Sequence, residues 1–243
     1  MALVCPAVLT EAAPWLCRTV DAYCERTSEA FDAEPLNAVT NVLMLLAAWG
    51  AAHLQRRHPN RDAAGLITAM IVAIAAGGVG AFLFHTTAAV WAVILDMLPF
   101  LVFMLLVLWL TLTRFFAWPW AAAAAGIVAF VLILVLGGLV LPPGALGSAA
   151  YYLLPLVVLS VVALVLLARR SPAGPSYFAA AIAFGGALAA RQLDGPLCDT
   201  IPSGTHFIWH SLAALLAYIL IRTAILHAPP RPDSFAPVVT RGP

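Results

Sequence analysis

Four ionisable residues stand inside long stretches that are otherwise apolar: His85, Asp96, His206 and His210. Ionisable groups in such stretches are costly, so each is first considered a functional residue. His206 and His210 are four residues apart, which puts both imidazoles on one face of a helix, about a turn from each other. With His85 as a third ligand, they form a three-histidine set with one open position, the arrangement of a catalytic zinc ion.

A zinc ion in such a set would supply hydrolytic chemistry. Zinc lowers the pKa of a bound water to about 7, so a hydroxide nucleophile is present at neutral pH. Asp96 could take a proton from that water and return it to a leaving amine. It could equally orient one of the histidines as an outer partner.

Other roles fit the same residues. A single histidine at a membrane interface is more often hydrogen-bonded or snorkelling than a metal ligand, and a His-x-x-x-His pair could bind haem or line an ion path. The lack of further paired charges inside the apolar stretches argues against a transporter. His53, His58 and His227 are interpreted as solvated.

A second polar cluster lies near the N-terminus: Asp21, Glu25, Glu29, Asp32, Glu34 and Asn37. Carboxylates and an amide oxygen in one short segment suit calcium. They suit equally a solvated acidic loop, in which Glu34 and Asn37 cap the helix that follows. The residues alone favour the solvated loop.

The composition requires a membrane to surround these elements. Apolar residues make up 63% of the 243 residues and charged residues 9%, against roughly 45–50% and about 25% in soluble domains. Lysine is absent and the net charge is +1, so nothing indicates nucleic-acid binding, and no protein partner is implied. The apolar segments are continuous and of helix length, which favours helices over a barrel.

The predicted fold is an all-α, integral membrane bundle of seven transmembrane helices. The residues before the bundle, 1–36, form an extracytoplasmic cap; the bundle occupies 37–228; and a proline-rich, disordered cytoplasmic tail occupies 229–243. The expected spans, each long enough to cross a hydrocarbon core about 30 Å thick, are 37–54, 66–84, 90–112, 117–137, 148–168, 176–193 and 206–226.

The arginines predict the orientation. With the N-terminus outside, nine arginines fall on the inner side and three on the outer side, as the positive-inside rule requires. His85 then ends the second span, Asp96 begins the third, and His206 and His210 begin the seventh, so all four lie at one depth near the outer interface. The shared depth of these four residues supports the predicted orientation independently of the arginines.

The four cysteines fall on the same outer face. An even number in an oxidising compartment indicates disulfides, in which Cys24–Cys198 ties the cap to the last loop and Cys5–Cys17 forms a local bridge. Four free, buried thiols are the alternative.

Four blocks of sequence resemble the alkaline ceramidases, within the superfamily of seven-helix zinc hydrolases that includes the adiponectin-receptor group. They span about residues 21–220, and the arginine-rich, lysine-free composition resembles a bacterial member. The blocks are Tyr23-Cys24-Glu25 with Glu34-Pro35-Leu36-Asn37 and Thr40-Asn41; Gly78 to His85; Leu95-Asp96-Met97-Leu98-Pro99; and Thr205-His206-Phe207-Ile208-Trp209-His210.

The resemblance implies zinc on His85, His206 and His210, with Asp96 as acid and base for a zinc hydroxide that cleaves the amide of ceramide or a related N-acyl lipid. It also implies the Cys24–Cys198 disulfide and calcium in the cap. The calcium ligands would be Asp21, the Tyr23 carbonyl, Glu25, Glu34 and Asn37.

The sequence departs from the family pattern at Ala81, where the family has a serine that helps to hold the oxyanion. Losing one such donor costs roughly 10²–10³ in rate. Thr86 or Thr87 could replace it, or the protein could be a lipid-binding receptor with little turnover. Trp209 is expected to line the substrate pocket, although a tryptophan at this depth is also typical of a membrane anchor.

Overall fold

The computed structural model describes residues 5–140 and 150–230. Helices make up the ordered structure of this part of the chain, and the only β-type pairing in it is an isolated bridge between Thr19 and Ala89. The α-helices are α1 (Ala7–Ala12), α2 (Pro35–Thr40), α3 (Val42–Arg57), α4 (Ala64–Thr87), α5 (Val90–Leu110), α6 (Trp120–Val140), α7 (Ala150–Ala168), α8 (Gly174–Leu193) and α9 (His206–His227).

Within the described residues, six helices are long and apolar enough to cross a membrane. The predicted all-α membrane bundle is therefore confirmed, but the count of seven spans is not. The exception is α8, whose 20 residues are rich in alanine and glycine and end in Arg191, Gln192 and Leu193. The other predicted spans match helices, and α2 and α3 together make the first, Pro35–Arg57.

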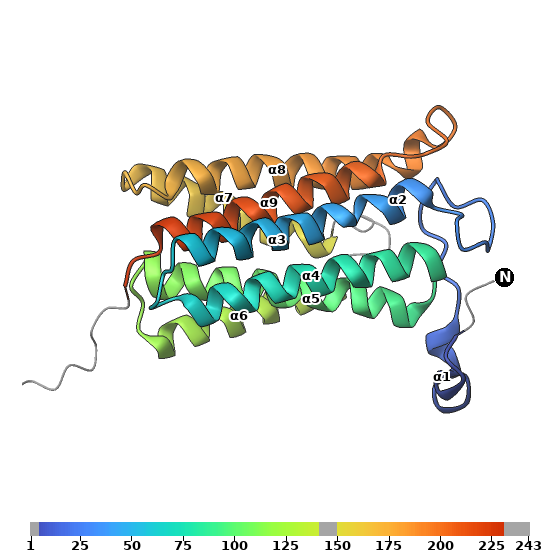
Figure 1. The fold of residues 1–243 in the computed structure, drawn as a ribbon, viewed down its shortest axis with the longest axis horizontal. Coiled ribbons are helices and arrows are strands. Elements are labelled where there is room, and N and C mark those ends of the chain that lie inside the picture. Colours follow the sequence, from blue (N-terminus) through green and yellow to red (C-terminus); the bar gives the residue numbers. More distant parts are fainter. Residues whose placement is uncertain (1–4, 141–149, 231–243) are drawn as a thin grey trace, which may run out of the picture.

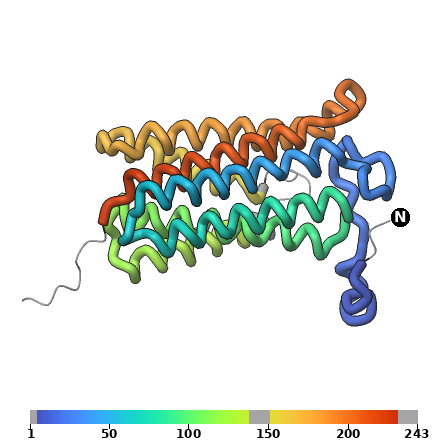
Figure 2. Tube along the Cα trace, in the orientation of Figure 1, coloured from blue at the N-terminus to red at the C-terminus, as the bar shows by residue number. Residues whose placement is uncertain are grey.

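The helices α3 to α9 form a closed ring in which each contacts the next and α9 contacts α3. Figure 1 shows α9 lying beside α3. The trace shows α9 running between α3 and α8, segments that are distant in sequence (Figure 2). Helices α4 and α5 approach each other closely at Gly80, where a Cβ would lie 2.0 Å from the carbonyl oxygen of Leu95. A glycine is needed there because backbone meets backbone.

The N-terminal segment folds into a cap at one end of the bundle, opposite the end of α9 (Figure 1). Its backbone joins the α4–α5 connection, since Val20 N–H donates to the Ala88 carbonyl at 2.7 Å and Val90 N–H donates to Arg18 at 3.1 Å. Both predicted disulfides form: Cys5–Cys17 within the cap, and Cys24–Cys198 between the cap and the segment before α9. The cap is therefore fixed over the ends of α4 and α9.

Candidate metal centre

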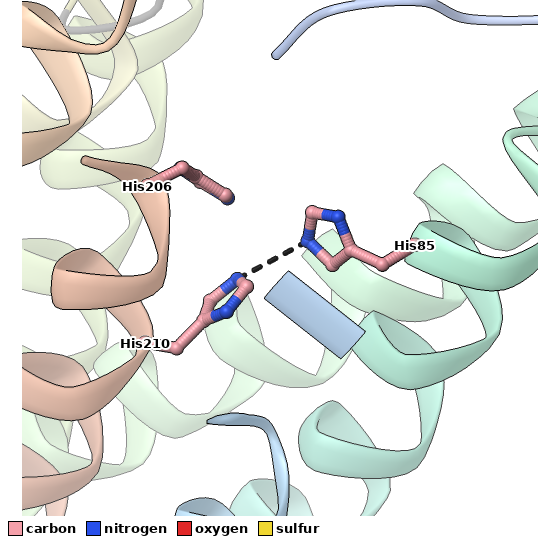
Figure 3. Close-up of side chains that lie close together, drawn as sticks. All are labelled: His85, His206 and His210. Carbon is pink, nitrogen blue, oxygen red and sulfur yellow. Dashed lines mark hydrogen bonds between the residues drawn. The ribbon is translucent and has the colours of Figure 1, made fainter. Parts of the chain in front are cut away.

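The three histidines converge at the cap end of the bundle. His85 lies in the last turn of α4, His206 is the first residue of α9, and His210 follows one turn later. Their side chains point toward one another from the two helices (Figure 3). All three are buried, with 0%, 1% and 3% of their surface exposed, and one ligand atom from each lies within 4.8 Å of the others.

The geometry of this group fits a zinc ion. The Nε2 atoms of His85 and His210 are 3.2 Å apart. Two nitrogens bound to one tetrahedral zinc at about 2.0–2.1 Å would be roughly 3.4 Å apart. Burying three imidazoles together without a shared ligand is costly, and among the described residues His206 Nδ1 has no hydrogen-bond partner.

Two residues outside the histidine group, Glu34 and Thr40, orient the rings of His85 and His210. The Glu34 carboxylate lies 2.6 Å from His85 Nδ1, and the Thr40 hydroxyl lies 3.0 Å from His210 Nδ1. Each contact occupies Nδ1 and leaves Nε2 facing the other histidines. Such partners commonly fix the tautomer and angle of a metal-bound imidazole. Sequence reasoning had assigned Glu34 to calcium and given Thr40 no role.

A buried aspartate that sequence reasoning missed positions the start of α9. Asp194 Oδ1 accepts hydrogen bonds from the backbone N–H groups of Thr205 at 2.7 Å and His206 at 2.9 Å. Its Oδ2 accepts one from Cys24 N–H at 3.0 Å. Gly204 has φ +63°, and a Cβ there would lie 2.1 Å from Asp194 Oδ1. The carboxylate thus caps a helix whose first residue is a candidate zinc ligand.

The sequence profile of the ceramidase family matches residues 19–229, which include the second half of the cap, all three histidines and the whole bundle. The chain belongs to the ceramidase family. No curated protein matches the chain. Family membership supports a ceramidase-like hydrolase, and it confirms the resemblance seen in the sequence.

In this ceramidase-family chain, Asp96 lies in the second turn of α5 and is half-buried. It is close enough to His85 and Arg191 to interact electrostatically with both. It does not belong to the group of potential ligands, which among the described residues comprises the three histidines alone.

Arg191 faces the same region, although sequence reasoning treated it only as an outer arginine. Its guanidinium lies 5.4 Å from the ring centre of Tyr23, 5.4 Å from that of Tyr152 and 5.2 Å from that of Trp209. Tyr23 also stacks on His206, with ring centres 3.6 Å apart. Burial raises the pKa of the Tyr23 hydroxyl, and the charge of Arg191 opposes this rise only in part. Aromatic faces of this kind stabilise a cation.

An apolar cavity extends into the bundle from these aromatic residues. Tyr152 and Trp209 lie in its wall, and it runs between α5, α7, α8 and α9 to Thr111 and Tyr177. A second apolar pocket shares Tyr152 and opens between α5, α6 and α7. Trp209 is 6% exposed and lies against Tyr152, with ring centres 4.7 Å apart. Trp209 is therefore buried in the cavity wall.

The position of the family serine carries only a methyl group. Ala81 is buried, one turn before His85 on α4. The Thr86 hydroxyl donates to the Phe82 carbonyl at 2.9 Å and the Leu83 carbonyl at 3.1 Å, and Thr87 donates to Leu83 at 2.8 Å. Both candidate replacement donors are thus hydrogen-bonded to their own helix.

The residues predicted to bind calcium are brought together only in part. The Glu25 carboxylate accepts from Leu36 N–H at 2.7 Å and Asn37 N–H at 2.8 Å, and so caps α2. Asp21 is exposed, and the Tyr23 carbonyl accepts from Arg26 N–H at 3.2 Å. Burial raises the pKa of Glu34, but hydrogen bonds from His85 and Asn37 and the charge of Arg26 outweigh burial and hold it below its usual value.

Proposed function

We propose that this protein is a zinc-dependent membrane amidohydrolase that cleaves ceramide or a related N-acyl lipid to a fatty acid and an amine. The main support for the proposal is that the apolar cavity adjoins the three-histidine group. Trp209 lies in the wall of the apolar cavity and directly precedes His210 in the three-histidine group. A lipid could therefore place its chains in the cavity with its amide beside the histidines.

His85, His206 and His210 would hold the zinc. When bound, zinc supplies a Lewis acid that polarises the amide carbonyl and lowers the pKa of a water. Asp96 would receive the proton of the attacking water and deliver it to the departing nitrogen. Its electrostatic interaction with His85 supports this role. Tyr152 and Trp209 would position the chains and exclude water from the site.

In the proposed topology, α8 also crosses the membrane as the sixth of seven spans, the N-terminus lies outside, and the C-terminus is cytoplasmic. Support for α8 comes from its contacts with α7 and α9. The site then lies near the outer leaflet, and the substrate enters laterally from it.

The second candidate function is a lipid-binding receptor with little turnover. One observation favours it: Ala81 offers no hydroxyl, and Thr86 and Thr87 direct theirs to their own helix. Tight binding of an N-acyl lipid without product would support the receptor. A haem-binding or ion-conducting protein would instead show a Soret band or metal flux in vesicles.

The test combines metal analysis with a substrate panel. Elemental mass spectrometry of purified protein should find about one zinc per chain, and fatty-acid release should be measured from ceramide and other N-acyl lipids. Alanine at His85, His206 or His210 should remove both zinc and release. His53→Ala is the matched control, because His53 stacks on Trp49 away from the group. Full activity in zinc-free His206→Ala protein would refute the mechanism.

A further inference from the structure

Arg26, a buried arginine in the cap, contacts the candidate zinc ligand His85 both directly and through Glu34. Arg26 is 7% exposed, and its Nε donates to Glu34 Oε1 at 2.5 Å. Its Nη2 donates to the backbone carbonyl of His85 at 2.8 Å, and its Nη1 donates to that of Ser28 at 3.2 Å. The contact with His85 satisfies a backbone carbonyl at the C-terminal end of α4, where a positive charge is favourable.

Glu34 links Arg26 to the imidazole ring of His85. Its Oε2 lies 2.6 Å from His85 Nδ1 and accepts from Asn37 Nδ2 at 3.0 Å. Arg26 therefore holds the backbone of His85 directly and its ring through Glu34. A planar guanidinium can make both contacts at once because its N–H groups are fixed in a fork.

The same residues do not fit the calcium ion that the family resemblance implied. Calcium takes six to eight oxygen ligands. Glu25 and Glu34 have both carboxylate oxygens engaged by N–H donors, and Asp21 is exposed. Of the predicted side-chain ligands, the one buried oxygen without a partner is Asn37 Oδ1. A guanidinium in contact with Glu34 would also repel a divalent cation.

We propose that Arg26 is a positioning residue that takes the place of a bound cation, so that the cap orients His85 for zinc without calcium. The proposal rests on zinc binding by the three histidines. Removing Arg26 leaves Glu34 buried without its ion-pair partner and frees the end of α4. Loss of an outer partner of this kind typically lowers metal affinity by about 10–100-fold.

The test measures zinc affinity of the full-length protein in detergent by competition with a chelating dye. Arg26→Gln should weaken zinc binding about 10–100-fold. Arg26→Lys should weaken it less, because an ammonium can still pair with Glu34. The matched control is Arg18→Gln, because Arg18 lies in the same cap with an exposed side chain. Unchanged zinc affinity in Arg26→Gln, or equal losses in the Gln and Lys variants, would overturn the proposal.

A second measurement uses the unaltered protein and does not depend on how the variants fold. Protein stripped of metals and reloaded with zinc alone should hydrolyse lipid equally with and without millimolar calcium, and titration calorimetry should show no calcium binding. A calcium-dependent rate, or a bound calcium in the cap, would overturn the inference alone. Absence of zinc from the intact protein would instead overturn the proposed function.

Discussion

The hydroxyl of Thr40, at the end of α2, lies 3.0 Å from Nδ1 of His210 on α9. That hydroxyl donates its own hydrogen to the Leu36 carbonyl at 2.7 Å. It can therefore only accept from His210, so the imidazole carries its proton on Nδ1. His210 Nε2 then carries the lone pair and faces His85 Nε2, 3.2 Å away.

Thr40→Val should weaken zinc binding by about tenfold, because it removes the acceptor that fixes this tautomer. Chelator competition on the purified protein measures the effect. Thr68→Val is the control, since Thr68 lies on α4 at an exposed hydrogen bond with Gln55. Equal zinc affinity in the two variants would show that the Thr40 contact has no role in metal binding.

Asp194→Ala should destabilise the protein by about 1–2 kcal/mol, because α9 loses a carboxylate cap on its first N–H groups. His206 would also lose its fixed position, so zinc should dissociate faster. Thermal unfolding and zinc release can be followed on the same sample. Asp199→Ala alters an exposed carboxylate in the same loop and should change neither. An unaltered melting temperature in Asp194→Ala would contradict the capping role.

Gly80→Ala should separate α4 from α5, since the added Cβ would meet the Leu95 backbone. The cost should be about 1–3 kcal/mol, and hydrolysis should fall further because Asp96 moves relative to His85. Gly65→Ala on the same helix meets no atom within 4 Å, so it should be neutral or stabilise by up to about 1 kcal/mol. The rate of lipid hydrolysis and the melting temperature should be measured for both variants. A stable, active Gly80→Ala protein would show that the close approach is dispensable.

Ala81→Ser should raise hydrolysis by up to about 10²-fold, because it adds a hydroxyl donor one turn before His85. Zinc content should stay constant, which separates an effect on the reaction from one on metal binding. Initial rates of fatty-acid release give the comparison. A zinc-loaded Ala81→Ser protein with an unchanged rate would mean that another group already stabilises the oxyanion.

Replacing Cys24 and Cys198 by serine should destabilise the protein more than replacing Cys5 and Cys17. The two bridges span 174 and 12 residues, and the chain-entropy relation gives a difference of roughly 2 kcal/mol. The longer bridge also holds the cap beside Asp194, so its loss should weaken zinc binding. Equal zinc affinity in both double variants would show that the Cys24–Cys198 bridge has no effect on the metal centre.

Much of the candidate site could be predicted from the sequence. His206 and His210 share a helix face through local spacing alone. The alternating direction of the spans brings His85 and Asp96 to the same depth. The outer position of all four cysteines indicated disulfides, and the family resemblance implied the Cys24–Cys198 pairing. The bundle follows from composition, because segments this apolar have no stable solvated alternative.

Only the tertiary structure decided the partners of these residues. Glu34 contacts His85 and Arg26, and Asp194 caps α9, because the cap loop and the segment before α9 follow paths that no hydrophobic period specifies. The acidic cluster was compatible with the calcium that the resemblance implied, since sequence shows which charges are near in the chain but not which cation faces them. Arg191 was missed for a similar reason. The end of α8 turns it toward three aromatic rings, two of which lie on other helices and one in the cap.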